Sequence, residues 1–112
     1  MLIATRILTL RGESGDAEIP IRIFAPERDE SMGCWKCRYA VEWPAGKFES
    51  QGYGEDAVQA IVIAFQKISA ELYTSDEHKS GRLGWNEPGD GYGFPMAKPT
   101  RDLAAGHDKE FY

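Results

Sequence analysis

The chain has 112 residues, of which 42% are hydrophobic and 28% charged, and its formal net charge is -5. This length and composition predict a single globular domain with one hydrophobic core. The negative charge repels polyphosphates, which argues against nucleic acid as a partner. The longest apolar run, residues 60–65, is too short to cross a bilayer, and no leader-like segment follows Met1. We therefore expect a cytoplasmic protein without membrane contact.

The first quarter of the chain predicts a β-hairpin. Residues 2–11 are rich in β-formers, and residues 17–26 place three isoleucines on one side of an extended segment. The turn-forming residues 12–16 join the two segments. The facing of the first strand stays open because both of its sides carry apolar residues. A bulge near Arg6 would let both sets reach the core.

Two further strands are predicted within residues 34–51. The segment 34–43 alternates clearly, with aromatic and apolar side chains on one face and mainly charged ones on the other. Pro, Ala and Gly at positions 44–46 are typical of a hairpin loop. A fourth strand follows at residues 47–51 and directs Phe48 inward.

A helix is predicted after residue 54, where the hydrophobic period changes from 2 to about 3.6. It spans residues 55–75, and Asp56 followed by Gln59 resembles a capping box at its start. The apolar stripe that we expect to pack on the sheet consists of Val58, Ile61, Val62, Phe65, Ile68 and Leu72.

Residues 80–95 are predicted to be irregular because they contain five glycines and two prolines. Trp85, Tyr92 and Phe94 are spaced through this segment. Large aromatic side chains gain most when they are buried. We therefore expect an ordered loop that these three aromatic residues anchor to the sheet.

The predicted fold class is α+β, with a single domain over residues 1–96. It consists of a four-stranded antiparallel β-meander in order 1-2-3-4, one amphipathic α-helix packed on one face, and an irregular Gly-rich C-terminal loop. The polar residues 97–112 are predicted to form a C-terminal tail.

Both cysteines of the chain lie in the sequence GCWKC, with the Cys-x-x-Cys spacing of redox and metal sites. On a strand, however, residues three apart point to opposite faces, which prevents a disulfide. Two further metal ligands are not apparent, since His78 and His107 are far apart in the sequence. We predict no cofactor, a core position for Cys37, and a reactive thiol at Cys34. A metal or redox site is the weaker alternative.

No catalytic constellation is visible, so we expect a non-enzymatic protein. His78 has no nucleophile elbow to act with and is predicted to be solvated at a helix C-terminus. The glycine-rich residues 89–95 lack the Gly-Lys-Ser/Thr ending of a phosphate loop. They are better explained as a folded loop.

The outward face of the sheet is predicted to gather basic residues. The candidate binding surface consists of Arg22, Lys36 and Arg38. Phe24 shares this face, and Arg6 joins it in one of the two facings of the first strand. One interpretation is a solvated face on which Glu42 and Glu49 pair with the cations. The other is a docking surface for an acidic partner or for a second copy of the chain.

Two motifs carry a resemblance to a known family. They are the helix opening GYGEDAVQAIVIAFQKISAEL at residues 52–72 and GYGFP at residues 91–95. With the order of elements, they resemble small uncharacterised bacterial proteins of a domain-of-unknown-function family, which combine a β-meander, a D-x-x-Q-A helix and a Gly-Phe-Pro ending. The resemblance covers residues 1–96. It implies a similar fold and a bacterial source, and it assigns no catalytic residue.

Two functional hypotheses follow. The first is a non-enzymatic binding or protein-interaction module, either homodimeric or partner-neutralising in the manner of an immunity protein. The alternative is a small-molecule or metal-binding protein that uses the region of Cys34 and Cys37 together with the aromatic C-terminal loop.

Overall fold

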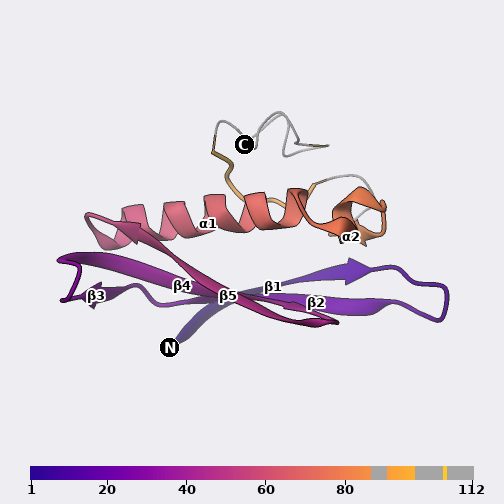
Figure 1. The fold of residues 1–112 in the computed structure, drawn as a ribbon, viewed down its shortest axis with the longest axis horizontal. Helices are drawn as coiled ribbons and strands as arrows, with labels where there is room; N and C mark the ends of the chain where they lie inside the picture. The colour runs from indigo at the N-terminus through magenta and orange to yellow at the C-terminus, as the bar shows by residue number, and fades with distance from the viewer. Residues whose placement is uncertain (87–90, 98–104, 106–112) are drawn as a thin grey trace.

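The computed structural model describes residues 1–86, 91–97 and 105. In chain order its elements are β1 (Leu2–Leu10), β2 (Ala17–Phe24), β3 (Glu27–Asp29), β4 (Cys34–Trp43), β5 (Gly46–Gly54), α1 (Ala57–Tyr73), α2 (Asp76–Lys79) and β6 (Leu83–Gly84). Figure 1 shows both helices on one side of the sheet and no described element on the other side. The predicted α+β class with one main helix is confirmed. Most of the predicted tail lies outside the described residues.

The sheet is antiparallel, and its four long strands β1, β2, β4 and β5 are neighbours in chain order. Two short strands extend it. β3 pairs with the first residues of β4, and β6 pairs with the last residues of β1. The predicted count of four strands is therefore wrong, because the described residues form six. β3 has three charged residues and β6 has two residues in a glycine-rich segment, so neither is long enough to show a period.

The core lies between the sheet and α1. Its fully buried strand residues alternate along β1, β2 and β4. They are Leu8, Ile19, Ile21, Cys37 and Val41. The facing of β1 is thus settled, with Leu8 and Leu10 inward. The register with β2 shifts between Leu2 and Ala4, so the bulge lies near Ile3 rather than near Arg6.

α1 begins as the sequence predicts but packs through a different stripe. The Asp56 carboxylate accepts the Gln59 N–H at 2.8 Å and so caps the first turn. Val58 and Val62, two residues of the predicted stripe, are 68% and 39% exposed. The buried positions of the first two turns are Ala60 and Ala64 instead. The helix is therefore rotated relative to the prediction.

The rotation follows from a close helix–sheet contact, which we call the glycine–alanine seam: Gly52 and Gly54 of β5 against Ala60 and Ala64 of α1. A Cβ added at Gly52 would lie 2.4 Å from the backbone nitrogen of Ala64, and one at Gly54 would lie 2.4 Å from that of Ala60. The two glycines are two strand residues apart, which is about 6.8 Å, and the two alanines are four helix residues apart, which is about 6 Å. The glycine pair and the alanine pair therefore have similar spacing. Larger side chains, such as valine, do not fit in this contact.

Candidate functional site

The first cation of the predicted binding surface, Arg22, lies on the uncovered face of the sheet. Its Nε donates to Glu42 of the neighbouring strand β4. This is one of the ion pairs that the solvated interpretation predicts. The other predicted carboxylate partner, Glu49, pairs instead with Lys47 two residues away on its own strand, at 3.2 Å. That part of the prediction is wrong.

The other two cations pair with carboxylates of β3, the strand that the sequence did not reveal. Lys36 Nζ lies 3.7 Å from a Glu27 oxygen and 3.6 Å from an Asp29 oxygen, and Arg38 Nε lies 3.3 Å from the same Glu27 oxygen. The Arg38 guanidinium also lies 5.5 Å from the centre of the Phe24 ring. The structure thus brings Lys36 and Arg38 together around Glu27.

Asp29 is held as a carboxylate by its surroundings. A hydrogen bond from the Ser31 hydroxyl, at 2.6 Å, lowers its pKa most, and the Met32 N–H and the Lys36 charge lower the pKa further. The negative charge beside Lys36 therefore persists in mildly acidic solution.

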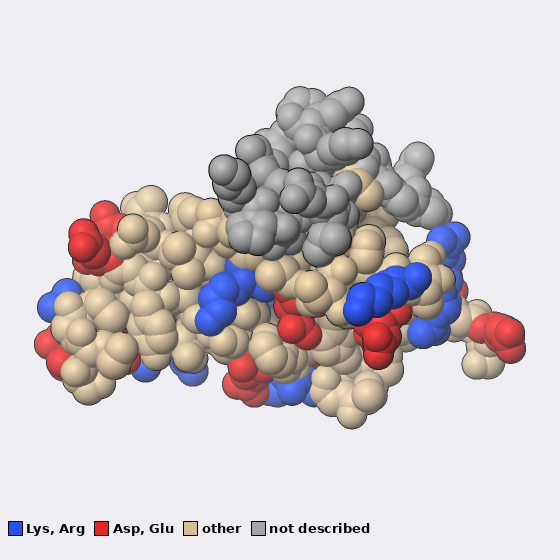
Figure 2. Space-filling view, turned by 45° about the horizontal axis from the view of Figure 1, so that its top comes forward, with Lys and Arg blue, Asp and Glu red and all other residues tan. Residues whose placement is uncertain are grey.

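The predicted binding surface is therefore a set of ion pairs and not a cationic patch. Arg22, Lys36 and Arg38 face carboxylates from β3 and β4. Charges of both signs are also interspersed on the helix side, where Figure 2 shows Lys and Arg next to Asp and Glu at several points. Partly exposed pairs of this kind add little stability, and paired charges project little field of one sign. An acidic partner has no strong electrostatic reason to dock here.

The two cysteines have different environments and are both free thiols. Cys37 is fully buried, its Sγ lies 3.3 Å from the Phe24 carbonyl oxygen, and burial raises the pKa of its thiol. Cys34 is half-buried at the start of β4, opposite Asp29. The Cys-x-x-Cys sequence thus gives two separate positions, of which Cys34 is the accessible one.

Thiol labelling checks this difference. We expect a disulfide-exchange reagent to modify Cys34 in the native protein within minutes, whereas Cys37 reacts only after denaturant is added, because the buried thiol is both inaccessible and protonated. Absorbance of the released chromophore measures both phases. A Cys34→Ser variant should lose the fast phase alone. Two native-state phases of equal rate would contradict the assignment.

The three predicted aromatic anchors gather around one arginine. Tyr92 and Phe94 are buried and Trp85 is half-buried. The Arg6 guanidinium lies 3.9 Å above the Trp85 ring and 4.7 Å from the Phe94 ring, and it donates to the carbonyls of Tyr92 and Gly93 at 3.1 and 2.9 Å. Arg6 therefore faces inward. The predicted option that it joins the outward basic face is wrong.

His78 of α2 lies among aromatic rings and contacts Tyr73 and Tyr92. Its Nδ1 shares a hydrogen bond with the Tyr92 hydroxyl, and its ring stands edge-on to Tyr73 with centroids 4.8 Å apart. Burial lowers the pKa of the imidazole, so the neutral form prevails at neutral pH. The expectation of a solvated histidine is wrong, because α2 turns this side chain toward Tyr92.

A feature that sequence reasoning missed is the open edge of β1. β6 covers only the last two residues of that strand. The Arg11 N–H donates to the Arg82 carbonyl at 3.0 Å, on the side of β1 away from β2. Backbone groups of alternate residues point to the same side, so those of Thr5 and Ile7 also point away from β2. No strand within residues 1–86 pairs with them there.

Apolar side chains accompany this open edge. Leu2, Ile3 and Ile7 are between 45% and 50% exposed. The only charged residue of β1, Arg6, is directed toward the aromatic loop. An exposed strand edge with several apolar residues and no outward charge is a typical site of strand pairing. The apolar residues at alternating positions 3 and 7 were a signal in the sequence, but the facing was ambiguous there.

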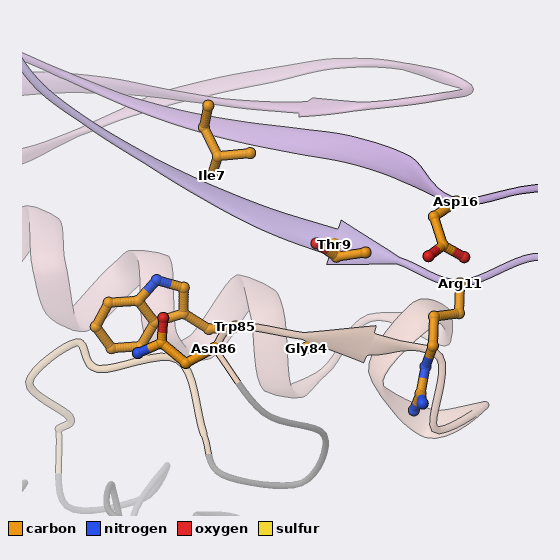
Figure 3. A pocket seen from close by; sticks show the side chains of 7 residues that line it. All are labelled: Ile7, Thr9, Arg11, Asp16, Gly84, Trp85 and Asn86. Carbon is orange, nitrogen blue, oxygen red and sulfur yellow. The ribbon is translucent and has the colours of Figure 1, made fainter.

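A pocket of about 380 Å³ adjoins the open edge where the chain leaves β6. Figure 3 shows Trp85 and Asn86 just after β6, with Ile7 and Thr9 on the neighbouring strand β1. Its lining residues are Ile7, Thr9, Arg11, Asp16, Gly84, Trp85 and Asn86. Apolar, aromatic and polar groups are thus combined beside backbone groups of β1 that pair with no strand of residues 1–86.

Metal ligands do not converge in the described part of the chain, where no three residues of the types His, Cys, Asp and Glu lie close enough to hold an ion. His107 lies outside the described residues. Over residues 1–86, 91–97 and 105, neither helix has the length and hydropathy needed to cross a bilayer.

The fold and the open edge define a small α+β domain with an antiparallel sheet that one helix covers on one face. Residues 4–96 match the family model described as "Domain of unknown function (DUF6968)". The match includes most of the chain, so the protein belongs to this family. The resemblance to a domain-of-unknown-function family is confirmed. Comparisons with curated proteins and with solved structures gave no match.

Proposed function

We propose that this chain is a non-enzymatic interaction module that binds a protein partner by strand addition at the open edge of β1. The observation that carries the proposal is the combination of unpaired backbone groups at Thr5 and Ile7 with exposed apolar side chains on the same strand. In strand addition, main-chain hydrogen bonds supply affinity and side-chain pockets supply specificity. The pocket beside Trp85 serves the second role.

The opposite edge of the sheet is a poorer binding site. β5 pairs only with β4 among the described strands, so its outer side is also open. It carries the exposed charges Lys47 and Glu49, and three of its nine residues are glycine. Edge charges discourage the approach of another strand, and glycine offers no side chain to pack. We therefore assign binding to β1.

The partner is an extended protein segment rather than nucleic acid, because the net charge is -5 and the cations of the sheet face are paired. The two free thiols support a reducing location, so the proposal includes the cytoplasm. The alternative of metal or small-molecule binding by Cys34 with the aromatic loop gains no support. Cys34 lies opposite β3, while the loop packs on Arg6 and α1.

Affinity capture with an edge-blocked variant tests the proposal. In Thr5→Pro the proline removes an N–H that points away from β2, so the β1–β2 hydrogen bonds stay in place while strand addition is blocked. We expect the wild-type bait to recover a protein partner from a lysate of the source organism, and the variant to lose it. Mass spectrometry identifies the recovered proteins, including any untagged copy of the chain.

The matched control is Val58→Lys, which adds a charge at an exposed apolar residue of α1, away from β1. It should recover the same partner as the wild type. Ile7→Lys, which places a charge on the edge without proline, should behave as Thr5→Pro does. Equal recovery by all four baits would show that the edge of β1 is not the binding site.

A further inference from the structure

We infer that the partner at the open edge is a second copy of this chain, paired antiparallel through β1 about a twofold axis at Thr5. This inference rests on the proposed function and adds to it the identity of the partner and the register. It follows from the direction of the backbone groups, the order of side chains along β1, and the length of the open edge.

The hydrogen-bonding groups decide which residues can face one another. Thr5 and Ile7 direct their N–H and C=O groups to the open side of β1. In an antiparallel pair, such residues face residues of the same kind and exchange two hydrogen bonds. A twofold axis at Thr5 therefore places Thr5 opposite its own copy, and Ile7 then lies opposite the bulged segment near Ile3 on each side of the axis.

The side chains favour this register over its neighbours. With the axis at Thr5, Arg6 faces the uncharged Ala4 of the other copy, and the apolar Ile7 lies near the bulged segment at Ile3. An axis one residue further along would oppose Arg6 to its own copy, and like charges directly opposite are unfavourable. An axis at Ile7 would include Thr9 in the new strand pair, but the outer edge of Thr9 already pairs with Gly84.

The length of the open edge also fits a second copy. β1 is open from Leu2 to Leu8, which are equidistant from Thr5, and β6 begins to pair at Thr9. The pairing therefore ends before Thr9, whose outer edge pairs with Gly84, and before Met1, whose carbonyl accepts the Ala25 N–H.

The dimer joins the two sheets into one continuous sheet. Its interface is a pair of strands with a few apolar side chains, which lies at the small end of protein interfaces. We therefore expect a reversible dimer. Sedimentation velocity of the purified chain from about 10 µM to about 1 mM should show a concentration-dependent rise from the monomer mass to the dimer mass.

Thr5→Pro should raise the dimer dissociation constant about tenfold or more, because the twofold axis makes each substitution remove two central hydrogen bonds. Val58→Lys should dimerise as the wild type does. Thermal unfolding of both variants, followed by circular dichroism, verifies that each is folded. If Thr5→Pro is unfolded, Ile7→Lys provides the same test.

Disulfide trapping tests the register. In a Cys34→Ser background, Thr5→Cys places two cysteines opposite each other across the twofold axis. Their Cα atoms are then about 5.5 Å apart, a distance that a disulfide can bridge. Thr9→Cys lies on the same face of the same strand, but its two copies are separated by eight residues, or about 27 Å. Mild oxidation should therefore cross-link Thr5→Cys and leave Thr9→Cys monomeric on a non-reducing gel.

The outcomes separate the inference from the function on which it rests. A monomer at every concentration, a dimer that Thr5→Pro leaves unchanged, or equal cross-linking of both cysteine variants would overturn self-pairing. If the chain is monomeric but captures another protein in a Thr5-dependent manner, strand addition stands and only the identity of the partner is wrong. If capture is also independent of Thr5, both proposals fail.

Discussion

Replacing Gly52 with alanine is expected to lower the free energy of unfolding by about 3 kcal/mol, at the upper end of the usual overpacking penalty. The new Cβ would lie 2.4 Å from the Ala64 nitrogen and 2.8 Å from the Ala60 oxygen. Both are backbone atoms of α1, which cannot rotate aside as a flexible side chain can. The helix must therefore move away from β5. Urea denaturation measures the effect.

Gly33→Ala is the matched control, because it adds the same methyl group at a different kind of glycine. A Cβ at Gly33 meets nothing within 4 Å, but the φ of +67° is unfavourable for alanine. We expect a loss of about 1 kcal/mol from that backbone strain alone. If Gly52→Ala costs no more than Gly33→Ala, the helix does not approach the sheet as closely as the seam requires.

Replacing Arg6 with methionine should lower the free energy of unfolding by about 2 kcal/mol or more, because the side chain loses charged hydrogen bonds and its stacking on Trp85. Methionine keeps the length of the side chain but cannot donate to the carbonyls of Tyr92 and Gly93. Urea denaturation measures the loss of stability. Hydrogen exchange should show faster exchange at residues 91–96 than in the wild type.

Arg22→Met is the control for Arg6→Met, since it removes an arginine from an exposed ion pair on the other face. Exposed pairs are worth at most about 1 kcal/mol, and residues 91–96 should exchange as before. Arg6→Lys should be intermediate because lysine keeps the charge and loses the planar fork. If residues 91–96 exchange hydrogen at the same rate in Arg6→Met as in Arg22→Met, then Arg6 does not hold the loop.

The long elements were predictable because their residues repeat. The alternation in β2 and β4 and the change of period at residue 54 give the sheet, the helix and the inward faces of both strands. The capping residue Asp56 gave the start of α1. Short elements were not predictable. β3 is a run of three charged residues that becomes a strand only because β4 lies beside it.

The candidate site depends on information that no local pattern contains. Hydrophobicity alone makes Val58 and Val62 part of the buried stripe, but the glycines of β5 select Ala60 and Ala64 instead. The ion-pair partner of Lys36 and Arg38 could not be predicted, because it lies on β3, a strand that the sequence pattern does not indicate. The open edge of β1 could not be recognised until the pairing of every strand was known, because edges are a property of the whole sheet.

The contact between Arg6 and the Tyr92–Gly93 segment joins positions 86 and 87 residues apart, which has a consequence for the order of folding. During synthesis β1 emerges before the loop, and its inward arginine finds its partners only after residue 93 has emerged. Such distant contacts slow folding because a long loop must close before they form. The β1–β2 hairpin can therefore form early in synthesis, whereas the loop closes over Arg6 only at a late step.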